Sequence, residues 1–446
     1  SEELGIEKPD IKLFYYILSD IGCDKDEIVK IGDNYLNDIE PLYLNNIYSF
    51  WFNFNDNFTI TENYVIFKDY AYLLNFFKEY YTECDKFLNI SDYVGERFDL
   101  VQAGGGNTSF KIRDIMFVKS SGCCLTNMSI NKNYVGVNFI NIKNQIKNIN
   151  SLNKKEREAQ SKNIIDSNKI FLKKNKPSIE TTLHCLTKKY TVHIHPIQFN
   201  AISALSTCND ILNDLFKDLK QEYCLVDYVT PGIDVTIELL KKYKNENIIF
   251  LKNHGLVFTS DNIEDLRRII DETINKLENY LDLNYFRYSV VNDISKNLKE
   301  ISKKRKITYL SENIYIDTFI NSEQDFNNVF RSFFPDKVVY CGISYCNIDK
   351  DHIDKDHIDK ENIDKENIDK QINLYIKTFK EIPKIFILKL DKYYLYISSN
   401  SINKCREIEQ VLVSHFRCYK DNNIFLDEKE INYLNNWDAE KYRKLV

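Results

Sequence analysis

The chain has 446 residues, of which 43% are hydrophobic and 28% charged, and its formal net charge is −6 at pH 7. This composition is typical of a soluble globular protein with two or three domains, and it argues against a broad nucleic-acid-binding surface. The start, Ser1–Lys8, is polar and acidic, so we expect no secretory signal. The sequence has no apolar run near the ~18 residues of a membrane span and no CxxC pair among the 11 cysteines. We therefore expect a cytoplasmic protein with free thiols and no membrane partner.

The first two blocks of the chain alternate helical and β-rich stretches. Residues 1–54 predict a helix followed by strands at Ile28–Ile31 and Ile47–Phe52. Residues 72–282 form a second block with the same kind of alternation. Its expected helices are Tyr70–Leu88 and Ile263–Leu281, and its expected strands are Met116–Val118, Thr191–His195 and Ile248–Leu251.

The third block, residues 300–446, reads as an α+β region with a low-complexity insertion. In residues 348–371 a five-residue unit beginning with Ile-Asp-Lys repeats, and a period of five matches neither a helix nor a strand. We expect a solvated, poorly ordered segment there, and repeat expansion explains His352 and His357 better than metal binding. Strands are expected near Val338–Cys341, Lys384–Leu390 and Tyr393–Ile397, followed by helices at Ser401–His415 and from Asp427 onward.

His193 and His195 are separated by one residue in the β-rich run Tyr190–His195. Side chains two apart on a strand point to one face, so both imidazoles can converge on one ion, with Cα atoms about 6.6 Å apart. Ile194 then faces the opposite side, into a core. Imidazole is a common zinc ligand, although two histidines in this pattern also fit packing or surface positions.

His254 follows the apolar strand Ile248–Leu251 in the sequence Asn-His-Gly. Gly255 allows a tight turn, so His254 can be presented inward. A turn histidine with no role is the alternative. Three of the seven histidines lie in strand-end contexts, which favours a shared metal site.

Glu180 lies where a loop leads into a helix, in the run Pro177–His184. A carboxylate is favourable in the first helical turn because of the helix dipole, and that charge alone can explain it. The functional alternative is a fourth metal ligand or a general base. His184, one turn further on, shares the same face, and packing explains it better than catalysis.

Two loops are rich in hydrogen-bond donors. Gly104–Ser109 reads GGGNTS, and Lys119–Gly122 reads KSSG after a short strand. Backbone N–H groups of glycine-rich loops can point at an anion, and Asn, Thr and Ser side chains add donors. Together the loops could hold a phosphate, although each alone is also common as an ordinary turn.

In chain order the sequence carries GGGNTS, KSSG, PSIETTLH, HIHP, YVTPG and NHGLV. This order resembles the class II aldolase/adducin family over roughly residues 80–280. FFPDKVVYCG (Phe333–Gly342) and NWDAEKYRK (Asn436–Lys444) are similar to the rhamnulose-1-phosphate aldolase branch. The resemblance implies an α/β fold, with α/β/α layers around a mainly antiparallel sheet, a Rossmann-like N-terminal remnant and an α+β C-terminal region.

The same resemblance implies a metal-dependent aldolase that cleaves or forms a carbon–carbon bond in a ketose 1-phosphate through a metal-stabilised enediolate. It implies Zn²⁺ or another divalent transition metal, with Glu180 as the catalytic acid/base. Where the fuculose-phosphate type has a second serine, this chain has Ile179, so one phosphate donor is missing. The implied metal ligands are His193, His195, His254 and Glu180, and the implied phosphate-binding residues are Gly106, Asn107, Ser121, Gly122 and Ser178.

Relatives of this type commonly form four-fold symmetric tetramers, so the resemblance implies a homo-oligomer. Other members catalyse epimerisation or dehydration at the same metal site. Adducin has the same fold but is a binding or scaffold protein. These remain alternatives to aldol chemistry. The presence of all three histidines and Glu180 favours an enzyme, because a non-enzymatic member need not retain them.

Residues 1–54 resemble the last part of a haloacid dehalogenase-like phosphatase. Lys8, in IEKPD, is similar to its lysine motif, and Asp33 and Asp38, in IGDNYLND, are similar to its magnesium-binding motif. In that family the nucleophilic aspartate precedes these motifs by a long stretch. We therefore expect a truncated remnant without phosphatase activity.

Overall fold

The computed structural model describes residues 4–25, 28–45, 47–56, 59–61, 64–171, 174–217, 223–322, 325–348 and 365–436. The chain divides into two compact units: unit 1 is Ser1–Gly95 with Leu100–Leu283, and unit 2 is Glu96–Asp99 with Asn284–Val446. The division into three sequence blocks stays a prediction. No helix within the described ranges is long and apolar enough to cross a membrane.

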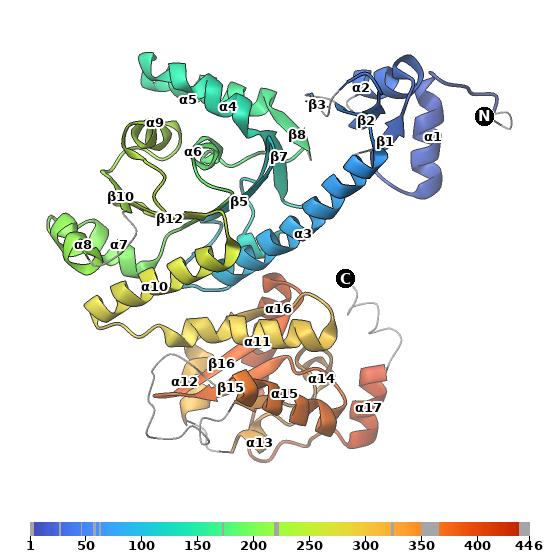
Figure 1. The fold of residues 1–446 in the computed structure, drawn as a ribbon. Helices are drawn as coiled ribbons and strands as arrows, with labels where there is room; N and C mark the ends of the chain where they lie inside the picture. The colour runs from blue at the N-terminus through green and yellow to red at the C-terminus, as the bar shows by residue number, and fades with distance from the viewer. Residues whose placement is uncertain are drawn as a thin grey trace. The chain divides into compact units, whose positions relative to one another are not determined.

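An eight-stranded sheet forms the centre of unit 1 (Figure 1). It consists of β5 (Asn107–Ile112), β6 (Ile115–Lys119), β7 (Tyr134–Asn138), β8 (Lys169–Phe171), β9 (Tyr190–Ile194), β10 (Tyr223–Val226), β11 (Ile248–Leu251) and β12 (Gly255–Ser260). The strand order is β10-β11-β12-β9-β5-β6-β7-β8, and β10 and β11 are the only parallel neighbours in this described sheet. The expected mainly antiparallel sheet of an α/β fold is confirmed.

Helices cover both faces of this sheet (Figure 1). They are α3 (Tyr70–Gly95), α4 (Phe139–Gln145), α5 (Lys154–Ser167), α6 (Thr181–Leu186), α7 (Ile197–Ser203), α8 (Cys208–Phe216), α9 (Ile233–Lys242) and α10 (Ile263–Leu281). Side chains on a strand alternate between faces: Val192 and Ile194 of β9 pack into a core with α3 and α10, whereas Val257 of β12 packs with α6 and α9. The position of His193 between Val192 and Ile194 therefore turns it toward the α6 and α9 side.

The sequence signals at the ends of α10 explain why this helix forms where it was predicted. The side-chain oxygen of Asn262 accepts hydrogen bonds from the backbone N–H groups of Glu264 and Asp265, which otherwise lack helical partners. Such a cap stabilises a helix by about 1 kcal/mol. Its buried residues recur at helical spacing from Leu266 to Leu277 and face the central sheet.

The N-terminal part of unit 1 is a smaller four-stranded sheet. Its elements are α1 (Ile11–Ile21), β1 (Lys30–Gly32), α2 (Glu40–Leu44), β2 (Ser49–Phe52), β3 (Thr59–Ile60) and β4 (Tyr64–Phe67). The order is β1-β2-β4-β3, with β1, β2 and β4 parallel. Phe50 of β2 joins this sheet to the rest of unit 1, because its ring lies 5.6 Å from that of Phe77 and 6.5 Å from that of Phe171.

Unit 2 is an α+β unit around a second four-stranded sheet. Its elements are α11 (Phe286–Ser302), β13 (Ile307–Leu310), α12 (Ile314–Ser322), α13 (Phe326–Val329), α14 (Pro335–Cys341), β14 (Cys346–Ile348), α15 (Lys365–Phe379), β15 (Ile385–Lys389), β16 (Tyr393–Ser399), α16 (Ile402–Cys418) and α17 (Glu428–Asn436). The strand order is β13-β16-β15-β14. α11 and α15 pack on one face of this sheet, and α12 and α16 pack on the other.

The predicted strand at Val338–Cys341 is wrong, because these residues belong to helix α14. Pro335 occupies the first helical turn, where a proline needs no N–H partner, and Gly342 ends the helix with a φ of +82°. The buried ammonium group of Lys337 donates to the carbonyl oxygens of Gly342 and Ile343, beyond the helix end. The apolar residues of this segment predict a strand when they are considered alone. The flanking Pro335 and Gly342 are typical of the start and the end of a helix.

Both ends of the low-complexity segment 348–371 belong to regular elements. The expectation that the whole segment is poorly ordered is therefore wrong for these ends. Ile348 closes strand β14, and residues 365–371 form the first turns of α15. Ile368 is fully buried because it continues the helical spacing of Ile372 and Tyr375, which follow the repeat. Residues 349–364, with His352 and His357, lie outside the described residues, as does most of the C-terminal segment 436–444.

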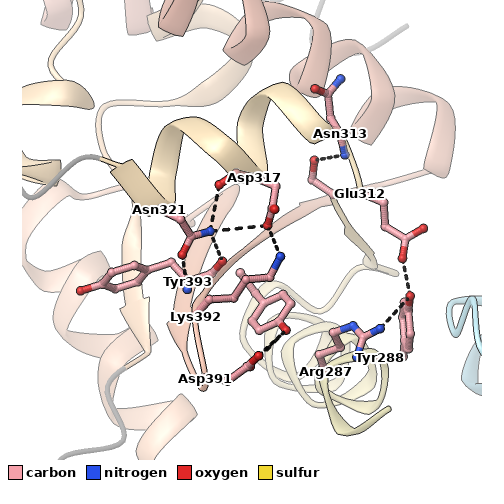
Figure 2. Close-up of polar contacts among 11 residues, drawn as sticks. Arg287, Tyr288, Glu312, Asn313, Asp317, Asn321, Asp391, Lys392 and Tyr393 are labelled. Atoms are coloured by element: carbon pink, nitrogen blue, oxygen red, sulfur yellow. Dashed lines mark hydrogen bonds and ion pairs between the residues drawn. The ribbon is translucent and has the colours of Figure 1, made fainter. Parts of the chain in front are cut away.

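A polar network ties helix α12 to the start of strand β16 and to the turn before it (Figure 2). The side chain of Asn321 accepts a hydrogen bond from the backbone N–H of Tyr393 at 2.8 Å and donates to its carbonyl oxygen at 3.2 Å. Lys392 forms an ion pair with Asp317 at 2.6 Å. Asn321 thus satisfies the backbone of one strand residue as a neighbouring strand would, which fixes the helix against the β15–β16 turn.

Candidate active site

His193, His195 and His254 lie together on the side of the large sheet that α6 and α9 cover. Their ring centroids are 5.0 Å (His193 to His195), 4.8 Å (His193 to His254) and 5.2 Å (His195 to His254) apart. One possible ligand atom from each residue lies within 4.8 Å of the other two. His193 is in β9, His195 follows its end, and His254 is in the β11–β12 turn.

The carboxylate of Glu180 lies against two of these rings. Its Oε2 is 3.1 Å from Nδ1 of His193, and its Oε1 is 3.3 Å from Nε2 of His254. Burial raises the pKa of the Glu180 carboxyl, but the two imidazoles outweigh this effect and hold that pKa well below its usual value. Glu180 precedes α6 at the N-cap position instead of lying in its first turn, because its backbone has a ψ of 5° and the helix starts at Thr181.

Close packing around His195 depends on Gly255, whereas Gly105 is tight against the carbonyl oxygen of Gln102, from which its Cβ would lie 2.9 Å. A Cβ atom on Gly255 would lie 2.4 Å from the carbonyl oxygen of Ile194 and 2.7 Å from Cδ2 of His195. A Cβ on Gly105 would lie 3.4 Å from Nδ1 of His195. The sequence predicted that Gly255 makes the turn, but Asn253 is the residue with a positive φ, 55°. Gly255 is needed for the close approach of β12 to His195.

Lys119 joins the two donor-rich loops. Its ammonium group donates to the carbonyl oxygens of Cys123 at 2.6 Å and Gly104 at 3.3 Å. The residue is 3% exposed, and burial lowers the pKa of its ammonium group. The backbone N–H of Ser121 also donates to the carbonyl oxygen of Lys176 at 2.7 Å. The glycine loop, the Lys119–Gly122 loop and the segment before α6 are therefore neighbours.

Asn107 starts strand β5, so the predicted loop Gly104–Ser109 ends at Gly106. Asn107 is paired with His193 in the antiparallel register, and paired residues point to the same face. Asn107 is 1% exposed, yet neither atom of its side-chain amide has a hydrogen-bond partner within the described ranges. Gly106 has a φ of +70°, and a Cβ there would lie 3.2 Å from the carbonyl oxygen of His193.

The remaining predicted anion-binding residues are more open to solvent. Ser121 and Gly122 are exposed, and nothing lies within 4 Å of a Cβ built on Gly122. The Oγ of Ser178 accepts a hydrogen bond from the backbone N–H of Glu180 at 3.3 Å. Ile179, between them, is 59% exposed. The two loops and the start of α6 thus contribute donors next to Glu180.

The three histidines fit a divalent transition-metal ion. In the part of the chain that the structure describes, Nε2 of His193, Nε2 of His195 and Nδ1 of His254 are buried without a hydrogen-bond partner. Burial, reinforced by the neighbouring imidazoles, lowers the pKa of His195 to about 4, which favours the neutral form that binds metals. Within the described ranges these histidines are the one group of three or more His, Cys, Asp or Glu side chains close enough to hold an ion.

Comparison with known families assigns the central part of the chain. Residues 87–281 match the family model described as the Class II Aldolase and Adducin N-terminal domain. This match covers less than half of the 446 residues, and it makes the central part of the chain similar to that domain. The matched range includes the three histidines, Glu180 and all five predicted phosphate-binding residues. Neither the rhamnulose branch nor the haloacid dehalogenase-like segment is part of that match.

Solved structures similar to the class II aldolase/adducin domain cover less than half of the chain. The N-terminal class II aldolase domain of a conserved protein from Thermoplasma acidophilum is 22% identical and covers 44% of this chain and 93% of its own, with a TM-score of 0.39. A sugar-phosphate aldolase from Thermotoga maritima is 13% identical, with coverages of 46% and 95% and a TM-score of 0.36. An L-fuculose-1-phosphate aldolase from Thermus thermophilus is 14% identical, with coverages of 44% and 93% and a TM-score of 0.29. No curated protein sequence matches the chain.

The sequence patterns do not predict a functional role for two buried residues beside the candidate site. For Lys119, the available signal is a lysine directly after the apolar run Met116–Val118. His184, expected to pack, is fully buried with Nδ1 at 2.7 Å from Oγ of Ser109. Burial lowers the pKa of His184 to about 3, so its imidazole is neutral.

In the N-terminal part, the structure brings Lys8 and Asp38 together. The Nζ atom of Lys8 is 2.6 Å from Oδ1 of Asp38, and Lys30 lies at 3.8 Å from the same atom. Burial raises the pKa of the Asp38 carboxyl, but the hydrogen bond from Lys8 and the nearby charges lower it overall. Asp33 is exposed. The haloacid dehalogenase resemblance and the loss of phosphatase activity stay predictions.

Proposed function

We propose that the class II aldolase/adducin domain is a metal-dependent aldolase that cleaves or forms a carbon–carbon bond in a ketose 1-phosphate. The observation that carries this proposal is the meeting of three imidazoles, one carboxylate and two donor-rich loops on one side of the sheet. Each imidazole has a buried nitrogen without a hydrogen-bond partner among the described residues, and one possible ligand atom from each lies within 4.8 Å of the other two. The loops offer backbone N–H groups and the side chains of Asn107 and Ser121, which suit a phosphate group that binds beside the ion.

The proposed ion is Zn²⁺ or another divalent transition metal, held by His193, His195 and His254, with Glu180 as a further ligand in the resting state. When bound, it supplies Lewis-acid polarisation of the substrate carbonyl and hydroxyl oxygens. The chain contributes the orientation of its ligands. Gly255 allows strand β12 to pack directly against the ring of His195, which supports the orientation of that ligand.

Glu180 is the proposed acid/base. Its carboxylate lies 3.1 Å from Nδ1 of His193 and 3.3 Å from Nε2 of His254, beside the proposed ion, where an Oε atom can accept a proton. In bond formation, Glu180 takes the proton from the substrate carbon next to the carbonyl group. In cleavage, it returns that proton to the same carbon. A positioned side chain of this kind contributes a factor of about 10²–10⁴ to the rate.

The phosphate of the substrate is proposed to bind the two loops and the start of α6. Asn107 supplies a buried amide without a partner among the described residues, and Lys119 holds the loops together through Gly104 and Cys123. Anchoring the phosphate aligns one carbon–carbon bond with the ion and with Glu180. The proposed phosphate-binding residues are Gly106, Asn107, Ser121, Gly122 and Ser178.

Metal content tests the proposal first. Protein purified without chelator should contain close to one zinc-like ion per chain by elemental mass spectrometry, and His195→Ala should lose it. The matched control replaces His352 and His357 together by alanine, which should leave the metal content unchanged. Absence of metal from the wild type, even after zinc is added, would leave the adducin-like binding module as the better interpretation.

Product analysis then separates the related chemistries. Incubation of the metal-loaded protein with ketose 1-phosphates should release an aldehyde and a triose phosphate, and a chelator should stop this release. An epimeric sugar phosphate as sole product would favour an epimerase, and loss of water would favour a dehydratase. A homo-oligomer, tetrameric by resemblance, stays a prediction for size measurement in solution.

A further inference from the structure

One buried hydroxyl group beside the candidate active site has no role in the proposed function. Ser120 is 5% exposed, and its Oγ has no hydrogen-bond partner among the residues that the structure describes. Buried polar side chains in folded proteins nearly always have a partner, so an exception calls for a ligand, an ion or a water molecule. The neighbours of Ser120 in the fold show where such a partner would bind.

Ser120 lies on the same side of the large sheet as the three histidines. Side chains along a strand alternate between its two faces. Met116 and Val118 of β6 pack with α6 and α9, and Ser120, two residues after Val118, continues this row. Ser120 keeps a strand-like position because it forms an antiparallel bridge with Pro177. Its hydroxyl group is therefore directed to the side that holds His193.

A second side chain without a partner, that of Asn107, lies at the neighbouring strand end. In the antiparallel register of β5 and β6, Ser109 lies opposite Val118. Two residues further along both strands, the same register leads to Asn107 and Ser120. Asn107 also pairs with His193 and shares its face. The buried amide and the buried hydroxyl group, neither of which has a partner within the described ranges, thus occupy neighbouring strand ends beside the histidines.

The segment before α6 brings a third donor to this place. The bridge between Ser120 and Pro177 makes Ser178 the next residue along that segment. The Oγ of Ser178 accepts a hydrogen bond from the backbone N–H of Glu180 at 3.3 Å, so its own hydrogen can be donated to a ligand. Side chains with uncharged donors therefore come from three segments: the start of β5, the end of β6 and the residues before α6.

We propose that Ser120 donates a hydrogen bond to the phosphate group of the substrate. A phosphomonoester has three terminal oxygens that accept hydrogen bonds strongly, and the side chains of Asn107, Ser120 and Ser178 can each donate to one of them. Ser120 thereby replaces the donor that is missing at Ile179, whose side chain is 59% exposed. A carboxylate has only two oxygens and would leave one of these donors unpaired, which disfavours it. The inference rests on the proposed function, because it names a further determinant of substrate specificity at the same site.

Calorimetric titration of the full chain with glycerol 3-phosphate tests this role of Ser120. We expect Ser120→Ala to bind this phosphomonoester about tenfold more weakly than the wild type, the usual effect of removing one hydrogen bond to a charged group. The KM for a cleaved ketose 1-phosphate should rise by the same factor. The metal content should stay that of the wild type, because the hydroxyl group has no hydrogen bond to lose within the described chain.

Ser49→Ala is the matched control. Ser49 is fully buried in β2 of the small N-terminal sheet, and its Oγ likewise has no partner in the described part of the chain. This variant should keep the affinity of the wild type for glycerol 3-phosphate. Urea unfolding checks the fold, and neither alanine variant should be less stable than the wild type, because each removes a buried hydroxyl group that has no partner.

Three outcomes would overturn the inference. They are no binding of glycerol 3-phosphate to the wild type, wild-type affinity in Ser120→Ala, which would leave only water as the partner of the hydroxyl group, and an equal loss of affinity in Ser49→Ala. The cleavage of ketose 1-phosphates tests the proposed function separately. A protein that cleaves none of them, but loses affinity in Ser120→Ala, would refute aldol chemistry and retain the role of Ser120. Cleavage with an unchanged KM in Ser120→Ala would refute this role and retain aldol chemistry.

Discussion

Replacing Asn107 by leucine should separate stability from function. Asn107 is 1% exposed, and both atoms of its side-chain amide are without a hydrogen-bond partner in the described part of the chain. One such buried group costs about 1–3 kcal/mol. Leucine has a similar size and removes both atoms. We expect the free energy of unfolding of the metal-free protein to rise by about 1–3 kcal/mol, while the affinity for a ketose 1-phosphate falls at least tenfold.

The assay is urea unfolding in the presence of a chelator, followed by circular dichroism, together with KM for the cleaved ketose 1-phosphate. Asn297→Leu is the matched control: Asn297 is fully buried in α11, and its amide likewise has no partner among the described residues. It should gain similar stability without a change in KM. If Asn107→Leu destabilised the protein, or kept the KM of the wild type, the assignment of Asn107 to the phosphate would be refuted.

Three further predictions address the acid/base, the packing at the site and the pH response. Glu180→Gln should lower kcat by about 10²–10⁴ with a smaller loss of bound metal; an unchanged kcat would contradict the acid/base role. Gly255→Ala should lower both the melting temperature and the metal content, because its Cβ would lie 2.4 Å from the carbonyl oxygen of Ile194; normal metal binding would argue against this steric reason. Burial lowers the pKa of His415 from 6.5 to about 4, so the unfolded chain takes up this proton first as the pH falls. The stability that depends on neutral His415 is complete above pH 6.5 and is lost toward pH 4, about 3 kcal/mol in all. Urea unfolding at pH 7 and pH 4.5 should show a weaker pH dependence for His415→Gln, and an equal dependence would exclude His415 as the cause.

Local sequence patterns predicted most residues of the candidate site. Strand alternation placed His193 and His195 on one face, and the apolar strand before His254 placed that residue at a strand end. Local patterns failed where the decisive contact lies far away in sequence. The link from Lys119 to Gly104 depends on how two loops meet, and no periodicity encodes it.

Errors in the fold prediction have a related cause. Apolar content suggested a strand at Val338–Cys341, whereas the proline and glycine around it define α14. Ile368 is part of the five-residue repeat, yet the structure places it in helix α15. It lies four residues before Ile372, so the two side chains share the buried face of this helix. In both places, the neighbouring residues outweigh the composition of the segment itself.

The strand order of the large sheet has a consequence for how the protein folds. Asn107 of β5 pairs with His193 of β9, and His193 pairs with Val257 of β12, so strands distant in the chain must find one another before the imidazoles meet. Pairing over such separations is slow. The proposed ion, held by all three imidazoles, would bind the finished sheet and not the nascent chain, and would therefore draw the folding equilibrium toward completion. The metal content of a preparation should then report the fraction of molecules in which this assembly is complete.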